Sequence, residues 1–161
     1  MAQSKQQRDE AVRLAPDKAA EYLLEECRMV LPGLQALFGF QLIAVFNARF
    51  ATLLSPGERI AHLVALALVA IAIALVMAPA ALHRQTDPHV LSDRFLRIST
   101  RLVLASMPAL AVALALEFYL VARVILQRPL MPALAAAAIL AFFVAAWFVL
   151  PRFSRLRGQA R

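Results

Sequence analysis

The chain has 161 residues, 62% of them hydrophobic, and its mean hydropathy is +0.71. Soluble domains are about half apolar, so this composition excludes an ordinary soluble domain and indicates a membrane protein. The formal charge of +7 would suggest a nucleic-acid ligand in a soluble protein. Cytoplasmic loops of membrane proteins carry the same excess of Lys and Arg, and no nucleic-acid partner is expected.

The first 28 residues are polar, with charges throughout and no early apolar segment, which is unlike a secretory signal peptide. "APDKAAEYLLEECR" has the features of a helix start, since Pro16 suits the first turn while Asp17 and Glu21 complement the helix dipole. Residues 1–28 are therefore predicted to form a partly helical cytoplasmic segment. The first apolar span is expected to act as its own uncleaved insertion signal.

Four apolar runs follow, and a helix needs about 20 apolar residues to cross the hydrocarbon of a bilayer. The runs are residues 29–53, 60–82, 102–126 and 130–150. "LSPGER" and "LQRP" predict tight turns between the first two and the last two runs. We therefore predict an all-α integral membrane protein whose four transmembrane helices form an antiparallel bundle over residues 29–150, with a basic cytoplasmic tail at 151–161.

The distribution of Lys and Arg predicts the orientation, because these residues accumulate in cytoplasmic loops. One side of the four spans would carry Lys5, Arg8, Arg13, Lys18, Arg28, Arg84, Arg94, Arg97, Arg101, Arg152, Arg155, Arg157 and Arg161. The other side has Arg59 and Arg128, with Arg49 and Arg123 near helix ends, where they can extend to the outer headgroups. Both termini are predicted to be cytoplasmic, in a multi-pass protein of the bacterial inner membrane.

The connection between the second and third spans is longer than the two turns. Asp87 can cap a helix that begins at Pro88, and apolar residues then recur at helical spacing while Arg94, Arg97 and Arg101 fall largely on another side. This pattern predicts an amphipathic inner helix whose arginines contact anionic lipid headgroups. A cationic end of the third span that follows the topology rule is the simpler interpretation, and the two are compatible.

Small residues predict the contact faces, because helices in lipid associate through close packing. In the second span they are Ala67, Ala70, Ala74, Ala78 and Ala81, and in the fourth Ala138, Ala141 and Ala145. The first span has a small and polar face made of Gly33, Ala36, Phe40, Ala44, Asn47, Ala48 and Ala51, with Gln41 at its edge. Gln35 points nearly the opposite way.

Glu117 is a carboxylate within the apolar stretch "AVALALEFYLVARVIL" of the third span. It shares a helix face with small and polar residues, and its depth matches the stretch between Gln41 and Asn47 of the first span. We expect Glu117 to hydrogen-bond Gln41 or Asn47, with Arg49 as a second candidate partner. An acid inside a membrane is a candidate functional group, although a structural crosslink between helices is an alternative that the sequence leaves open.

Candidate catalytic or metal-binding residues are sparse. His62 follows Glu58 by one helical turn, which suggests a pair on the outer surface. His83, Asp87 and His89 have no spacing typical of a strong metal motif. The sequence has neither a glycine-rich phosphate loop nor a nucleophile with a plausible base, so we expect no enzyme activity, no cofactor and no metal.

Two stretches resemble a bacterial four-span family, domain of unknown function six-three-two-eight. They are "YLLEECRMVLPGLQALFGFQLIAVFNARF" and "LSPGERIAHLVALALVAIAIALVMAPAALHR". The resemblance implies a four-helix inner-membrane protein with no established activity. It directs attention to a cytoplasmic-mouth cluster at the inner ends of the first two spans, made of Glu25, Arg28, Gln35, His83 and Arg84. An ion pair between Glu25 and Arg84 is expected there, either to hold the hairpin together or to bind a partner.

Two functional hypotheses follow. In the first, the chain forms a homo-oligomer that conducts ions or protons past the Gln41 and Asn47 face or past Glu117. In the second, it is a non-transporting accessory or scaffold subunit of a larger membrane complex. Lipid is the expected environment in both.

Overall fold

The computed structural model describes residues 16–85 and 93–152, and every element in these ranges is helical. The elements are α2 (Pro16–Val45), α3 (Phe50–Leu53), α4 (Pro56–Gln85), α5 (Asp93–Leu126), α6 (Leu130–Val144) and a π-helical turn, η1 (Ala145–Val149). The predictions about residues 1–15, the Asp87 cap, His89 and most of the basic tail lie outside the described residues.

Four helices in the described ranges are long and apolar enough to cross a membrane, as expected. They cover Lys18–Val45, Pro56–Gln85, Arg94–Leu126 and Leu130–Arg152. Large apolar side chains such as Phe40, Ile43 and Phe142 lie on the outside of these helices. An apolar surface of this extent is typical of contact with lipid, which agrees with a multi-pass membrane protein.

The first helix has other bounds than predicted. α2 begins at Pro16 and ends at Val45, so the predicted span at 29–53 is interrupted before its end. Residues 46–49 form a turn, in which the side-chain oxygen of Asn47 accepts a hydrogen bond from the backbone N–H of Arg49 at 2.9 Å. Such a local bond offers the backbone an alternative to the helix, and the chain resumes as the short α3.

A capping box begins α4. The Ser55 backbone N–H donates to Glu58 Oε2 at 2.8 Å, and the Glu58 N–H donates to Ser55 Oγ at 3.4 Å. Pro56 occupies the first helical position, where its missing N–H costs nothing. The motif explains why the "LSPGER" turn passes directly into a long helix.

The arginine-rich segment after the described gap belongs to α5 and is not a separate helix. α5 runs without a break from Asp93 to Leu126, and Arg94, Arg97 and Arg101 lie exposed on its first turns. The predicted separate amphipathic helix is therefore not seen in residues 93–101, which form a cationic helix end. α5 stops at Gln127, whose φ of 53° is left-handed and whose N–H bonds the carbonyl of Arg123 at 3.0 Å.

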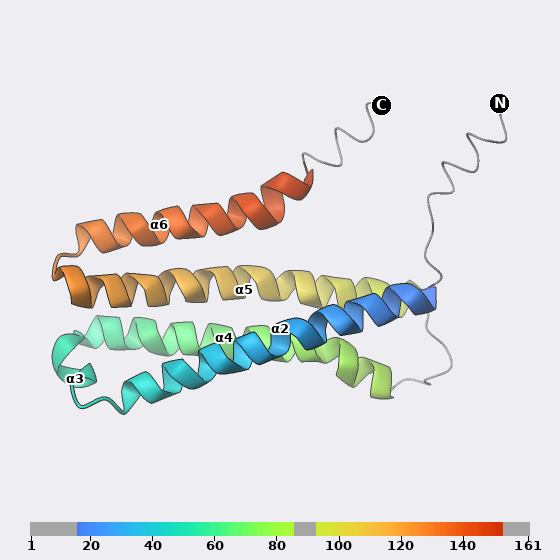
Figure 1. Cartoon of the computed structure of the whole chain (residues 1–161), viewed down its shortest axis with the longest axis horizontal. Helices are drawn as coiled ribbons and strands as arrows, with labels where there is room; N and C mark the ends of the chain where they lie inside the picture. Colours follow the sequence, from blue (N-terminus) through green and yellow to red (C-terminus); the bar gives the residue numbers. More distant parts are fainter. Residues whose placement is uncertain (1–15, 86–92, 153–161) are drawn as a thin grey trace.

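The helices lie in a layered arrangement (Figure 1), in which α5 lies between α4 and α6 while α2 crosses over α4 and α5. Successive long helices progress in opposite directions across the view. α6 packs mainly on α5, and Pro132 is the one buried residue of α6. The closest pair is α4 and α5, and both α2 and α6 pack against it. The polar residues described below meet where α2, α4 and α5 come together.

Buried residues recur at heptad spacing along these three helices. They are Ala20, Cys27, Leu34 and Gln41 in α2; His62, Ala65, Val69, Ala72, Val76 and Pro79 in α4; and Ser99, Ser106, Ala113 and Leu120 in α5. A 3.5-residue repeat is typical of left-handed helix packing. Polar residues occupy this seam on each helix, so the seam is not purely apolar.

The predicted alanine faces were largely wrong. Ala67, Ala70, Ala74 and Ala81 of α4 are exposed, as are Ala138 and Ala141 of α6. Gly33 and Phe40 of the predicted α2 face also lie outward. Alanine occurs on several faces of these helices, so small size alone cannot select the face that packs.

Candidate functional site

Three polar side chains from three helices meet inside the bundle, at the end that also holds α3. Gln41 of α2 donates from Nε2 to Glu117 Oε1 of α5 at 3.1 Å. His62 of α4 places Nδ1 3.0 Å from the same oxygen. Its Nε2 lies 3.1 Å from the backbone oxygen of Gln41. We call Gln41, His62 and Glu117 the polar triad.

The heptad seam explains why these residues meet. Gln41 is the last buried residue of the α2 seam and His62 is the first of the α4 seam, so both belong to faces that already pack together. Glu117 lies one turn before Leu120 on α5. At about 1.5 Å per residue, His62 lies roughly 9 Å inside the start of α4 and Glu117 about 14 Å before the end of α5. The triad therefore lies within the apolar part of the spans.

Water has little access to the triad. Gln41 and His62 are each only 4% exposed, and the Glu117 side chain is 19% exposed. The ring of Phe50 from α3 covers the imidazole edge-on, with ring centroids 5.2 Å apart. The turn at residues 46–49 and α3 therefore form a cap over His62.

Hydrogen bonds at both imidazole nitrogens require two protons in all. Both imidazole nitrogens face oxygen atoms, and a backbone carbonyl can only accept, so Nε2 must carry a proton. Nδ1 and Glu117 Oε1 then need one proton between them, on either atom. With that single shared proton the pair is neutral overall, which is the least costly state for ionisable groups away from water.

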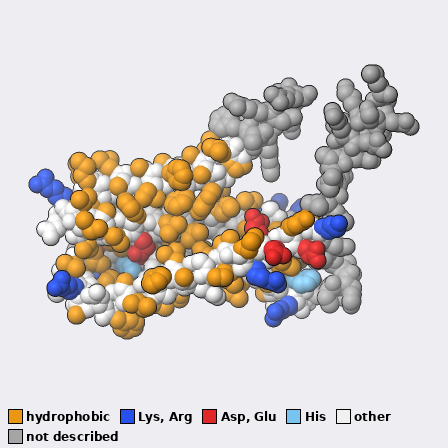
Figure 2. All heavy atoms as spheres, viewed as in Figure 1, with side chains coloured by type: hydrophobic (Ala, Val, Ile, Leu, Met, Phe, Trp, Pro, Cys, Tyr) orange, Lys and Arg blue, Asp and Glu red, His pale blue; other side chains and the backbone are white. Residues whose placement is uncertain are grey.

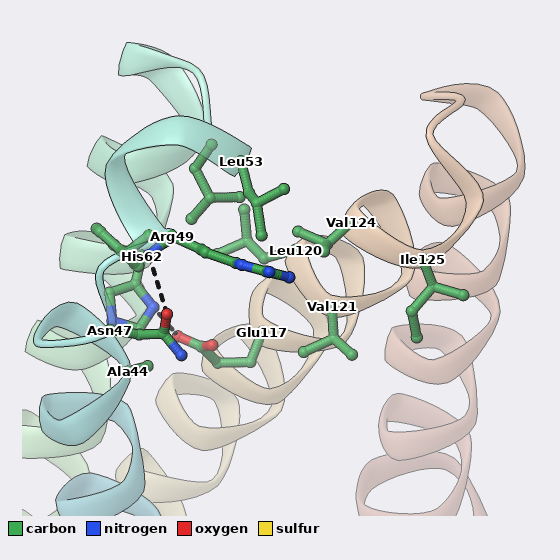
Figure 3. Close-up of a pocket in the computed structure, with 12 residues that line it drawn as sticks. Ala44, Asn47, Arg49, Leu53, His62, Glu117, Leu120, Val121, Val124 and Ile125 are labelled. Atoms are coloured by element: carbon green, nitrogen blue, oxygen red, sulfur yellow. Dashed lines mark hydrogen bonds and ion pairs between the residues drawn. The ribbon is translucent and has the colours of Figure 1, made fainter.

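A pocket of about 390 Å³ lies beside the triad. Its apolar wall includes Leu53, Leu120, Val121, Val124 and Ile125, while its polar lining is Asn47, Arg49, His62 and Glu117. The Arg49 side chain extends across from the turn before α3 towards α5, above Glu117 (Figure 3). The pocket thus has an apolar body, an acid at its base and an arginine on its wall.

The four residues of the predicted intramembrane cluster lie near one another, but they make different contacts. The expected hydrogen bond between Glu117 and Gln41 is present. Asn47 lines the pocket, but its side-chain oxygen is bonded to the Arg49 N–H and not to Glu117. Arg49 also lines the pocket, and no ion pair joins it to Glu117 among the described residues.

His62 was assigned wrongly from the sequence. It was expected to pair with Glu58 on the surface, whereas it is buried and paired with Glu117. Glu58 instead pairs with Arg123 at 3.2 Å, and so Arg123 joins α5 to the start of α4. The signal for His62 was its spacing to Ala65, Val69 and Ala72, which places all four residues on one seam.

The cytoplasmic-mouth cluster is only partly assembled. Arg28, His83 and Arg84 line one groove between α2 and α4. Glu25 lines a different depression beside it, and within residues 16–85 and 93–152 it forms no ion pair with Arg84. Gln35 is exposed on α2. The predicted Glu25–Arg84 pair is therefore not formed.

An apolar cluster lies on the groove side of the triad, and Cys27 and Val76 of this cluster also line the groove. Cys27, Leu34 and Val76 are buried there, with Leu23, Ile73, Val103 and Leu110 packed against them. The described part of the chain holds no cluster of three His, Cys, Asp or Glu side chains that could bind a metal ion. The arrangement can accept a polar group at Glu117 from the adjoining pocket.

A family model described as "Family of unknown function (DUF6328)" matches residues 9–151. No curated protein and no solved structure matches the chain.

Proposed function

The chain belongs to the Family of unknown function (DUF6328), and from the geometry of its polar triad we propose that it binds a small amphiphile inside the membrane. The ligand would occupy the pocket between α3, α4 and α5, with a hydrogen-bond donor at Glu117 and an apolar tail along α5. The bundle would be antiparallel, in the bacterial inner membrane, with both termini cytoplasmic as the Lys and Arg distribution predicts. The pocket would then face the outer half of the bilayer.

The free oxygen of Glu117 is the observation that carries this proposal. Gln41 and His62 both bond Oε1, and no described residue bonds Oε2. A carboxyl oxygen held in place beside a pocket is a strong acceptor for an amine or hydroxyl group. The apolar wall formed by Leu120, Val121 and Val124 supplies the burial that an amphiphile needs.

The binding test uses ten-carbon amphiphiles that differ only in the head group: decylammonium, decanol and decanoate. Binding to the purified full chain in lipid nanodiscs is measured by calorimetry. Decylammonium and decanol should bind more tightly than decanoate, because only the first two can donate to Glu117 and decanoate could pair only with Arg49. Glu117→Gln should weaken decylammonium binding by about tenfold, the loss of one charge-assisted bond.

Two bulky variants provide the matched control. Val121→Trp places its side chain in the pocket wall and should abolish binding, whereas Leu134→Trp changes an exposed residue of α6 and should not affect it. Equal binding of all three amphiphiles, or unchanged binding in Val121→Trp, would show that partition into lipid explains the signal and would overturn the proposal.

A second candidate is conduction of ions or protons by a homo-oligomer. An acid and an imidazole inside a membrane are typical of proton pathways, and the outward alanines Ala67, Ala70 and Ala74 of α4 would allow close packing of another copy. The core between α2, α4 and α5 includes an apolar cluster, so we place such a path between copies. Proton and alkali-cation flux in proteoliposomes that is lost in Glu117→Gln would favour this candidate. No flux from either protein would favour a non-transporting accessory or scaffold subunit.

A further inference from the structure

A second groove lies at the end of the bundle opposite α3, and the proposed ligand pocket does not involve it. It has a volume of about 340 Å³ and lies between α2 and α4. Its deeper part is apolar, with Leu31 of α2 and Val76, Met77 and Ala80 of α4. Its rim carries Arg28, His83 and Arg84. The groove thus changes from apolar to basic along its length.

The two guanidinium groups are available to a ligand. Arg28 and Arg84 come from different helices and are exposed, and among the described residues neither forms an ion pair. Along α2, Glu26 lies two residues before Arg28 and is exposed, while Glu21 and Glu25 line a separate depression that Arg28 also lines. Figure 2 shows charged and histidine side chains gathered where α2 begins and α4 ends, beside a largely apolar body.

The dimensions of the groove fit a lipid better than a small solute. Val76, Ala80 and Arg84 are one helical turn apart, so the apolar strip extends roughly 12 Å from the basic rim. The ring of His83 contacts the ring of Phe95 of α5, with centroids 6.0 Å apart. This contact places the rim beside α5. A phosphate on the rim would leave an attached acyl chain to lie along Met77 and Ala80.

We propose that this groove binds one anionic phospholipid of the cytoplasmic leaflet, with its phosphate between Arg28 and Arg84. Guanidinium groups bind phosphate with two parallel hydrogen bonds, which a point charge cannot do. Basic grooves between transmembrane helices at the cytoplasmic face are suited to anionic headgroups. The bound lipid would connect α2 to α4 at an end where no ion pair between described residues does so.

Native mass spectrometry of the full chain in detergent tests the site. The probes are phosphatidylglycerol, phosphatidylcholine of the same chain length, and inorganic phosphate. Phosphatidylglycerol should give a one-lipid adduct that survives a tenfold excess of the other two. The double variant Arg28→Gln/Arg84→Gln should weaken it by about 25-fold, since each guanidinium contributes about fivefold.

Two further variants test whether the site depends on these two arginines in particular and on the apolar strip. Arg59→Gln/Arg128→Gln removes two exposed arginines from the end that holds α3 and should leave the adduct unchanged. Ala80→Trp fills the apolar strip without changing a charge and should remove the lipid adduct. If the double glutamine variant does not fold, as judged by its melting in lipid-free detergent, Ala80→Trp alone decides.

The proposal fails if phosphatidylcholine binds as well as phosphatidylglycerol, or if the adduct persists in Ala80→Trp. It also fails if inorganic phosphate displaces the lipid, because the ligand would then be a free anion. These outcomes do not depend on the pocket beside Glu117, so either proposal can fail without the other.

Discussion

At the scale of single residues, Glu117 shows how a carboxylate is held inside an apolar helix. Two neighbouring helices each direct a polar side chain to Oε1, and the imidazole shares one proton with it, so no net charge is buried. The hydrogen bonding is incomplete on one side, because the buried side-chain oxygen of Gln41 has no partner among the described residues. The triad therefore crosslinks three helices and leaves acceptor atoms unused.

Replacing Glu117 should distinguish the crosslink from simple packing. Glu117→Ala leaves the Gln41 amide and the imidazole Nδ1 without a partner, and we expect a loss of about 1–3 kcal/mol in the free energy of unfolding. Glu117→Gln retains an acceptor for Gln41 and a partner for the ring, so its loss should be smaller. Unfolding in mixed detergent micelles measures both. If the two variants are equally stable, the hydrogen bonds do not stabilise the bundle.

At the scale of helices and turns, Glu58 has two partners at the start of α4. It accepts the Ser55 N–H of the capping box and pairs with Arg123 of α5. The Arg123 side chain is 32% exposed, so solvent screens the ion pair. In the capping box, the bond that the Glu58 carboxylate accepts is the shorter one, at 2.8 Å. The bond that the Ser55 hydroxyl accepts is longer, at 3.4 Å.

Three variants at this cap should therefore differ in stability. Glu58→Ala loses the cap and the ion pair and should cost about 1–2 kcal/mol. Glu58→Gln can still accept from Ser55 and should cost less than about 1 kcal/mol. Ser55→Ala removes only the longer bond and should cost about 0.5 kcal/mol. The same micelle unfolding measures all three, and a Ser55→Ala loss as large as that of Glu58→Ala would contradict the assignment.

At the scale of the whole molecule, α4 and α5 form the most closely packed pair, and α2 and α6 pack against this pair. α6 contributes one buried residue, so most of its apolar surface faces outward. Lipid can cover this surface, as it covers the outward side chains of α2. The two ends of the bundle also differ: one holds α3 and the polar triad, while the basic rim of Arg28, His83 and Arg84 lies at the other.

The proposed orientation predicts which end faces the cytoplasm. In a Cys27→Ala background, Thr52→Cys and Arg128→Cys should react with a membrane-impermeant maleimide in intact spheroplasts, because both lie exposed at the α3 end. Gln85→Cys, exposed at the other end, should react only after the membrane is permeabilised. Labelling of Gln85→Cys in intact spheroplasts would reverse the orientation and place the lipid groove outside.

The helical spans could be predicted because a span depends on local composition. An apolar run must satisfy its own backbone in lipid, and only a helix does this within one segment. The Glu117–Gln41 contact could also be predicted, since depth and face together select few partners. The end of α2 at Val45 could not, because it depends on the side chain of Asn47 bonding the next turn rather than solvent.

By itself, the sequence determined the four apolar helices, the turn at "LSPGER" and the presence of an acid on a small, polar helix face, because each follows from residues close in the chain. Only the tertiary structure decided that His62 faces Glu117 and not Glu58, that α4 packs through Ala65 and Ala72 and not Ala67 and Ala70, and that Glu25 and Arg84 line different depressions. The physical reason is the same in each case. A transmembrane helix is apolar on every side, so hydrophobicity does not select its buried face, and the neighbouring helices do.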